Sequence, residues 1–274
     1  MKNINITINE LLKNTIIENP FIGHSYAFPH FNTKYDLDLI ISEILYILKT
    51  GISWRDLRSS INWSSLYFHH RKFIIHNIYK LAFDNILSLY ISKIKNINGL
   101  LIDSSFFQNK FGRNKIARNK FFKNKNCCKV SIISDLHGIP FSILTKEGNF
   151  HDATIFEDHK SDIDHLSPLL PTNKVIFFMA DKAYHSKNIS NYFNEKNIKV
   201  LIPPKKNKTK NVKQFTLKQH KLYKNRLLIE HLFKDIKRFK RLNMIFDANH
   251  STFLGFIYLA LTAISINKIN NILF

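Results

Sequence analysis

The chain has 274 residues, which is long enough for one large domain or two smaller ones, each with its own core. Lys and Arg number 41 against 20 Asp and Glu, and the net charge of +21 predicts a polyanionic partner such as nucleic acid. The only cysteines, Cys127 and Cys128, are adjacent, so a disulfide-stabilised secreted protein is excluded. No signal peptide opens the chain, and its longest apolar run, residues 253–264, falls short of the roughly 20 residues that span a bilayer. We therefore expect a cytoplasmic protein without a membrane segment.

Residues 1–95 predict an all-α region. The first 34 residues have no long hydrophobic periodicity and predict an arm with at most one helix. From Tyr35 to Thr50, apolar residues recur at helical spacing, and Gly51 follows as the residue that ends this helix. Ser53 opens a Ser-x-x-Asp pattern that predicts the start of a short second helix.

A third helix is predicted after Asn62, whose side chain suits the N-cap position. The polar residues expected along the flank of this helix are His69, His70, Arg71 and Lys72. A further helix is predicted from Lys80 to about Ile94. A tight turn, a short helix and a longer basic helix are compatible with helix-turn-helix DNA binding, although a plain helical bundle explains the same pattern equally well.

From residue 96 to residue 274 the pattern is typical of an α/β domain. The predicted strands cover residues 99–104, 129–134, 139–144, 174–180 and 199–202. The predicted helices cover residues 152–164, 186–196 and about 217–240, and a buried terminal helix follows. A hairpin around His137-Gly138 comes first, and strands then alternate with helices. This order predicts a mixed sheet of the ribonuclease-H-like kind.

Four polar residues of the last predicted long helix, Tyr223, Arg226, Glu230 and Lys237, follow the spacing Tyr-x2-Arg-x3-Glu-x6-Lys. At 100° per residue they lie within about 60° of one another, and apolar residues occupy the opposite side. A carboxylate flanked by a phenol, a guanidinium and an ammonium suits a site that holds a metal and binds phosphate. A solvated helix face with Glu–Lys pairs is the usual explanation of such a charge run. The chain has only seven Glu, however, and chance would produce these offsets roughly one time in a thousand.

This spacing resembles the C-terminal signature of bacterial insertion-sequence transposases of the DDE type, in the group called IS-five-like. That family also has two upstream aspartates, each at the end of an apolar strand. Gly99-Leu-Leu-Ile-Asp103-Ser-Ser resembles the first motif, and Val175-Ile-Phe-Phe-Met-Ala-Asp181-Lys-Ala-Tyr184 resembles the second. Both upstream aspartates are therefore present.

The resemblance extends from about Tyr35 to the C-terminus. The segment from Ile44 to Leu57 is similar to the helical N-terminal region of that group. Two positions depart from the family pattern, because the family has Gly where Ala183 stands and Pro where Arg58 stands. Neither position carries the chemistry.

The resemblance implies that Asp103, Asp181 and Glu230 hold two Mg²⁺ or Mn²⁺ ions, with Asp103 bridging both and the other two contacting one each. Phosphodiester cleavage needs an activated oxygen nucleophile and neutralised charge, and two ions about 3.5–4 Å apart supply both. Mg²⁺ prefers hard carboxylate oxygens. Taken alone, either aspartate is equally typical of a strand end or a turn. The order of strand-Asp, strand-Asp and helix-Glu favours the metal site.

Further residues are candidate contacts to DNA. Arg226 and Lys237 suit backbone phosphates, the first through its bidentate fork and the second as a point charge. Tyr223 donates to a phosphate, stacks on a base or packs in the interior. His151-Asp152 resembles the family's His-Asp pair and contacts a metal or phosphate, unless Asp152 caps the next helix. The remaining candidates, for which a solvated loop or helix flank is the alternative, are Arg71, Lys72, Lys205 and Lys206.

The resemblance implies a transposase that excises and inserts its own DNA element. The helical region would bind the terminal inverted repeats, and the ribonuclease-H-like domain would cut them and join them to target DNA. Because two ends must be cut together, a homodimer on double-stranded DNA is expected, in the cytoplasm with the nucleoid. The alternatives are a metal-dependent nuclease of the same fold and an inactive or domesticated DNA-binding protein.

Overall fold

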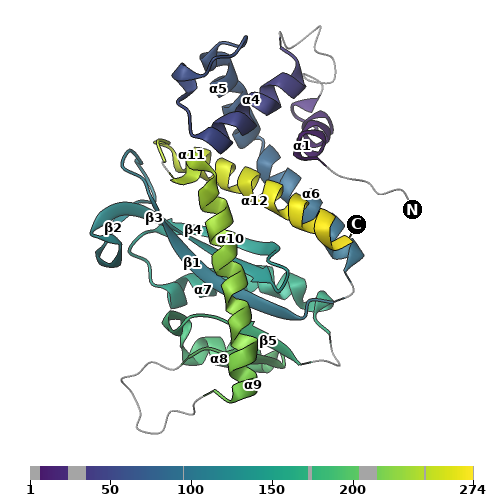
Figure 1. Cartoon of the computed structure of the whole chain (residues 1–274), viewed down its shortest axis with the longest axis vertical. Helices are drawn as coiled ribbons and strands as arrows, with labels where there is room; N and C mark the ends of the chain where they lie inside the picture. Colours follow the sequence, from purple (N-terminus) through teal and green to yellow (C-terminus); the bar gives the residue numbers. More distant parts are fainter. Residues whose placement is uncertain are drawn as a thin grey trace. The chain divides into compact units, whose positions relative to one another are not determined.

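The computed structural model describes residues 7–23, 35–94, 96–171, 175–203, 215–243 and 245–273. The chain forms two compact units, each built from segments that are distant in the sequence (Figure 1). Unit 1 consists of Met1–Lys93, Gln108–Asn114 and Asp235–Phe274, and unit 2 consists of Ile94–Phe107 and Lys115–Lys234. The C-terminal residues therefore belong to the same compact unit as the N-terminal helices. The boundaries of these units differ from the predicted division into residues 1–95 and 96–274, which is based on expected function.

Unit 1 is helical. Its helices are α1 (Ile8–Ile17), α4 (Leu37–Thr50), the 3-10 turn η1 (Trp54–Asp56), α5 (Trp63–Ile75), α6 (Ile78–Lys93), α11 (Lys240–Asn243) and α12 (His250–Leu273). A capping box between Thr7 and Glu10 starts α1, and Asn62 caps α5 by accepting a hydrogen bond from the amide of Ser64. Gly51 ends α4 in the left-handed region, with φ of 71°, as the sequence predicts.

Two details of the N-terminal helices differ from expectation. The Ser-x-x-Asp pattern gives only the single 3-10 turn η1, in which Ser53 accepts from the amide of Arg55. His69 and His70 are both buried instead of lying on a polar flank. The ring of His70 stacks on Phe256 at 4.5 Å, and its Nδ1 atom lies 2.8 Å from the hydroxyl of Tyr79. Burial lowers the pKa of His70 to about 3, so this ring is neutral and belongs to the core.

The interior of unit 1 is closed by α12, which packs along α6 and also contacts α4 and α5. By length and composition, the stretch His250–Ile272 meets the requirement for a membrane span, contrary to the expectation from the shorter apolar run. In the structure 72% of an apolar 18-residue segment within this stretch is buried, as in the core helix of a globular protein. Beside it, Arg241 and Asp247 form a buried two-point ion pair, with hydrogen bonds of 3.1 and 2.8 Å.

Unit 2 contains a six-stranded sheet within the described residues. The strands are β1 (Gly99–Gln108), β2 (Ala117–Asn119), β3 (Lys125–Asp135), β4 (Pro140–Glu147), β5 (Ile176–Met179) and β6 (Ile198–Leu201). Their order is β2-β3-β1-β5-β6, and β4 also pairs with β3. The strands β1, β5 and β6 are parallel, whereas β2 and β4 run antiparallel to β3.

The predicted hairpin, the five predicted strands and the mixed sheet are confirmed. Sequence patterning missed β2, which lies in the basic segment between β1 and β3. It also ended the first strand too early, since β1 continues through Ser105, Phe106 and Phe107 to Gln108.

The helices of unit 2 are α7 (Asp152–Leu166), α8 (Lys187–Glu195) and α9 (Leu217–Tyr223). The helix α7 contacts β3 and β4, and α8 contacts β6. The 3-10 turn η5 (Lys224–Arg226) leads from α9 into α10 (Leu227–Arg238), which contributes residues to both units (Figure 1). The predicted helix from 217 to 240 is thus helical almost throughout, but it is interrupted by a tighter turn and ends before Lys240.

Candidate active site

Two neighbouring parallel strands bring the two candidate aspartates together. Leu101 of β1 pairs with Met179 of β5, and continuing this parallel register by two residues places Asp103 opposite Asp181. Asp103 lies in the middle of β1, so the idea that it caps a strand or begins a turn is wrong. Asp181 follows β5 and is the N-cap of the 3-10 turn η4 (Lys182–Tyr184), where its side chain accepts from the amide of Lys182.

The segment from α9 to α10 adds a positively charged residue, Arg226, and a carboxylate, Glu230, to the site. Arg226 donates to Asp103 Oδ2 through Nη1 at 3.4 Å and pairs with Glu230 through Nη2. The hydroxyl of Tyr223 donates to the carbonyl oxygen of Ala180 at 3.1 Å, directly before Asp181. Arg226 therefore contacts β1, Tyr223 contacts the end of β5, and Glu230 is linked to Asp103 through Arg226.

The electrostatics of this site centre on Asp103. Burial raises the pKa of Asp103 to about 6, and the nearby negative charges of Asp181 and Glu230 add to the rise. The Ser104 amide and the Arg226 guanidinium oppose it, because both stabilise the charged carboxylate. Burial also raises the pKa of Tyr223, so that hydroxyl keeps its proton as a donor. The site is an acidic cluster that is only partly neutralised by one arginine.

The donor set of this cluster suits a hard divalent cation. Its side chains offer carboxylate oxygens, which Mg²⁺ and Mn²⁺ prefer. Added positive charge would favour the ionised form of Asp103, which burial disfavours by raising its pKa. In the part of the chain that the structure describes, no three His, Cys, Asp or Glu side chains meet the geometry of a metal site. In this structure the positive charge next to Asp103 and Glu230 comes from Arg226, which contacts both carboxylates.

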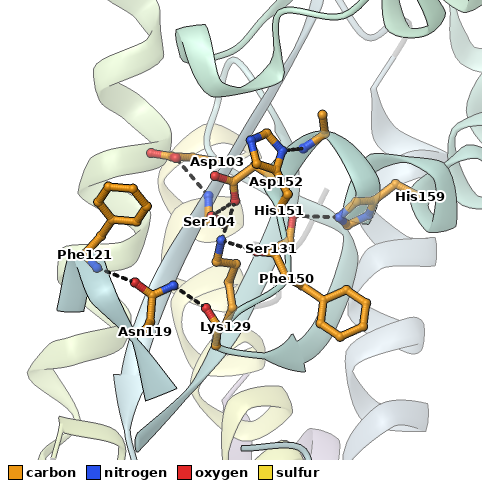
Figure 2. Close-up of polar contacts among 12 residues, drawn as sticks. Asp103, Ser104, Asn119, Phe121, Lys129, Ser131, Phe150, His151, Asp152 and His159 are labelled. Atoms are coloured by element: carbon orange, nitrogen blue, oxygen red, sulfur yellow. Dashed lines mark hydrogen bonds and ion pairs between the residues drawn. The ribbon is translucent and has the colours of Figure 1, made fainter. Parts of the chain in front are cut away.

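A second polar cluster lies beside Asp103 (Figure 2). The Ser104 amide donates to Asp103 Oδ1 at 2.8 Å, and the Ser104 hydroxyl donates to Asp152 Oδ1. The Lys129 ammonium lies 3.1 Å from the same Asp152 oxygen and donates to the carbonyl oxygen of Phe150 at 2.7 Å. The side chains of Lys129 and Asp152 are 5% and 21% exposed, so this is a largely buried ion pair.

The structure separates the two members of the His151-Asp152 pair. His151 Nδ1 accepts a hydrogen bond from the amide of Ala153 at 3.2 Å and so caps α7. Asp152 is the first residue of that helix and not its N-cap, and its carboxylate points to Ser104 and Lys129 (Figure 2). The capping role therefore belongs to His151, and only Asp152 reaches the strand that carries Asp103.

The remaining candidates belong to unit 1 or lie outside the described residues. Lys237 lies on α10, in the part of that helix that belongs to unit 1. Arg71 is exposed and Lys72 half-buried on α5 of unit 1. Lys205 and Lys206 lie outside the described residues. The roles of these four residues in binding DNA stay predictions.

Ser104 and Lys129 were missed by sequence reasoning. Lys129 belongs to no motif in the sequence, and yet it stands in β3 between Cys128 and Val130, which are both buried. A lysine inside an otherwise apolar strand is a signal for a buried, paired ammonium. Ser104 gave no such signal, because a serine after an aspartate is common at any turn.

The sequence that forms this site matches a known protein family. Residues 95–264, more than half of the chain, match the family described as the transposase DDE domain. The chain belongs to the DDE transposase family. Members of this family are DNA-cleaving enzymes that generally use divalent metal ions.

A solved transposase structure resembles this DDE transposase in fold. The piggyBac transposase, in a cryo-electron-microscopy synaptic complex with hairpin DNA, matches with a TM-score of 0.53 and 12% identity, over 97% of this chain and 76% of that one. The catalytic domain of the Mos1 mariner transposase matches with a TM-score of 0.30 and 10% identity, over 60% of this chain and 90% of that one. No curated protein matches the sequence. The ribonuclease-H-like class predicted for the mixed sheet is confirmed.

Proposed function

We propose that this DDE transposase cleaves and joins the DNA of an insertion-sequence element of the IS-five-like group, with Asp103, Asp181 and Glu230 as its catalytic carboxylates. The observation that carries the proposal is the convergence of three distant segments. Arg226 bridges Asp103 of β1 and Glu230 of α10, while Asp181 follows the strand next to β1. This is the order of strand, strand and helix that the signature implies.

The three carboxylates would hold Mg²⁺ or Mn²⁺, and such ions supply an activated oxygen nucleophile and stabilise the leaving oxygen. Arg226 stabilises these side chains in the absence of a cation, because its guanidinium contacts Asp103 and Glu230. Once a phosphodiester enters, the same guanidinium is within reach of a phosphate oxygen, to which a planar fork binds with two hydrogen bonds. Tyr223 holds the start of this segment to the end of β5 through the Ala180 carbonyl, so packing is its main role.

The helical N-terminal region is proposed to recognise the terminal inverted repeats, with Arg71 and Lys72 on α5 as phosphate contacts. Lys205, Lys206 and Lys237 are proposed to hold backbone phosphates nearer the cut. Two ends of an element must be cut in one complex, so we propose a homodimer on double-stranded DNA. The piggyBac structure, a synaptic complex with hairpin DNA, supports DNA binding by analogy of fold alone, whereas the dimer rests on the need to cut two ends together.

The test is cleavage of a plasmid that carries the DNA flanking the reading frame, with Mn²⁺ or Mg²⁺ added. Asp103→Asn, Asp181→Asn and Glu230→Gln should each lower nicking by at least about 10³-fold, because each removes a negatively charged ligand and keeps the shape. Binding of the same DNA, measured by fluorescence anisotropy, should stay within about twofold.

The matched control is Asp158→Asn, since Asp158 is a half-exposed aspartate of α7 that pairs with Lys146. It should nick at the rate of the unaltered protein. Near-normal nicking by Asp103→Asn, Asp181→Asn or Glu230→Gln would remove that residue from the catalytic set. Nicking without joining of a cut 3′ end to a second duplex would identify a nuclease of the same fold instead of a transposase.

A further inference from the structure

Lys129 is a cation that the protein buries beside the candidate active site. Its side chain is 5% exposed, and its ammonium has three described neighbours: the Asp152 carboxylate, the Phe150 carbonyl oxygen, and the ring of Phe106 at 4.9 Å. A buried charge that loses its partner is strongly destabilising, so a pair of this kind keeps one geometry. Lys129 therefore fixes the Asp152 carboxylate in place.

Asp152 passes this constraint to β1. Its Oδ1 atom accepts from the Ser104 hydroxyl as well as from Lys129, and the Ser104 amide donates to Asp103 Oδ1. The connection from Lys129 to Asp103 thus runs through two residues and joins β3, the start of α7 and β1 (Figure 2). Partners of this kind orient a ligating carboxylate and tune its affinity for a cation.

A second aspect of this arrangement concerns charge. Asp152 is a fourth carboxylate close to the acidic cluster, as shown by its contact with the residue that follows Asp103. With Lys129 paired to it, Asp152 adds no net negative charge to the cluster and has one oxygen already engaged by two donors. Without Lys129, that carboxylate would be free to turn toward a divalent cation.

We propose that Lys129 is a positioning residue, which holds Asp152 as a support for Ser104 and Asp103 and keeps that carboxylate from becoming an additional cation ligand. The proposal rests on the proposed function, because it takes Asp103 as a cation-binding residue. It assigns part of the charge balance of the cluster to a side chain outside the Tyr-Arg-Glu-Lys pattern.

Lys146 provides a matched control. It is the direct cross-strand partner of Lys129, pairs with another aspartate of α7, Asp158, at 2.7 Å, and lies 5.5 Å from the ring of Phe150. Its side chain is 31% exposed, and no described contact joins it to Ser104 or Asp103. Lys129→Met and Lys146→Met therefore remove the same charge from the same pair of strands, but only one of them removes it from the cluster.

The first measurement is Mn²⁺ binding to the full chain without DNA, by electron paramagnetic resonance. We expect Lys129→Met to bind Mn²⁺ about fivefold more tightly, because an unneutralised carboxylate then joins the cluster. Lys146→Met should bind as the unaltered protein does, and so should Lys129→Arg, which keeps the charge. In the double variant Lys129→Met with Asp152→Asn the extra affinity should disappear, since the freed carboxylate is gone.

The second measurement is the rate of DNA nicking at saturating Mn²⁺. Lys129→Met should nick about 10–100-fold more slowly, because Asp103 loses its support, while the KM for DNA stays unchanged. Tighter cation binding together with slower cleavage is a combination that general loss of folding does not produce.

Unchanged or weaker Mn²⁺ binding by Lys129→Met would overturn the inference, provided that the unaltered chain binds Mn²⁺ and nicks DNA. An equal response of Lys146→Met would overturn it as well, because the effect would then come from charge anywhere on this face. If the unaltered chain binds no Mn²⁺ at all, the proposed function fails first and the inference fails with it.

Discussion

At the residue scale, Asp103 is a buried candidate carboxylate whose acid–base chemistry departs from that of an isolated aspartate. Its pKa is raised from 3.8 to about 6, first by burial and then by the carboxylates of Asp181 and Glu230. The folded chain therefore binds this proton more tightly than the unfolded chain does. Asp103 lowers the free energy of unfolding at neutral pH, and this loss disappears as the pH falls through 6 toward 3.8.

Asp103→Asn removes this titration and gives a test that needs no activity. In the absence of divalent cations, the difference in unfolding free energy between Asp103→Asn and the unaltered protein should move in favour of the variant by about 2 kcal/mol between about pH 4.5 and pH 7.5. Urea unfolding at each pH measures it. Adding Mg²⁺ at pH 7.5 should reduce the difference, since a bound cation stabilises the carboxylate. A difference that does not change with pH would show that Asp103 titrates normally in the fold.

The identity of the candidate carboxylates could be predicted from the sequence, but their supporting contacts could not. Asp103, Asp181 and Glu230 stand at positions with a recognisable spacing relative to apolar segments. The partners of Asp152, by contrast, come from β1 and β3. No local pattern in the sequence indicates which serine or lysine contacts Asp152. Lys129 was visible only as a polar residue in an apolar strand.

At the element scale, the segment that carries the signature shows where helical periodicity is a good guide and where it fails. The chain keeps right-handed helical dihedrals at Tyr223 and Leu227, but residues 224–226 form a 3-10 turn. Such a turn rotates the chain by about 120° per residue instead of 100°, so Arg226 lies further round than an ideal α-helix would place it. A sequence spacing alone cannot reveal this change, because it depends on the contacts that the segment makes.

The second limit of periodicity concerns the end of α10. The helix predicted over about 217–240 would carry both Lys237 and Lys240, but α10 ends at Arg238 and Lys240 begins α11. A control substitution for Lys237 must therefore come from α10 itself. Arg238 is the better choice, since it is the neighbour of Lys237 on α10 and its side chain is 82% exposed.

We predict that Lys237→Ala lowers strand transfer at saturating protein by at least about tenfold, while the affinity for DNA falls less than about threefold. The reason is that Lys237 lies two turns after Glu230 on the same face of α10, where its ammonium suits a phosphate near the cut. Arg238→Ala removes an equal charge and should change both quantities by less than about twofold. Equal losses of strand transfer in the two variants would mean that α10 offers only a general basic surface.

At the scale of the whole molecule, the net charge of +21 predicts how binding responds to salt. Lysines and arginines that neutralise phosphates release counterions, so the logarithm of the binding constant falls linearly with the logarithm of the salt concentration. With six to ten such contacts, affinity should fall by roughly 10³–10⁵ between 50 and 200 mM salt. Fluorescence anisotropy with a labelled duplex measures this slope. A flat response would mean that the basic segments do not face DNA.

The succession of strands and helices along the chain could be predicted from the sequence, whereas the order of strands in the sheet and the division into compact units could not. Alternation of strands and helices after residue 99 is a local property, and the structure confirms it. The packing of α12 against α6 joins segments separated by more than 150 residues, and both helices are apolar around much of their surface. Hydrophobic patterning shows that each helix is buried, but it does not show what buries it.

This division has a consequence for synthesis of the protein. Unit 2 is inserted between the parts of unit 1, and α12 is the last of the described helices to leave the ribosome. During translation, α4, α5 and α6 emerge first and must wait with their apolar faces uncovered, while the entire sheet of unit 2 can already assemble. A message cut short before residue 250 would therefore yield a chain that holds Asp103, Asp181 and Glu230 but leaves its N-terminal helices open to aggregation and proteolysis.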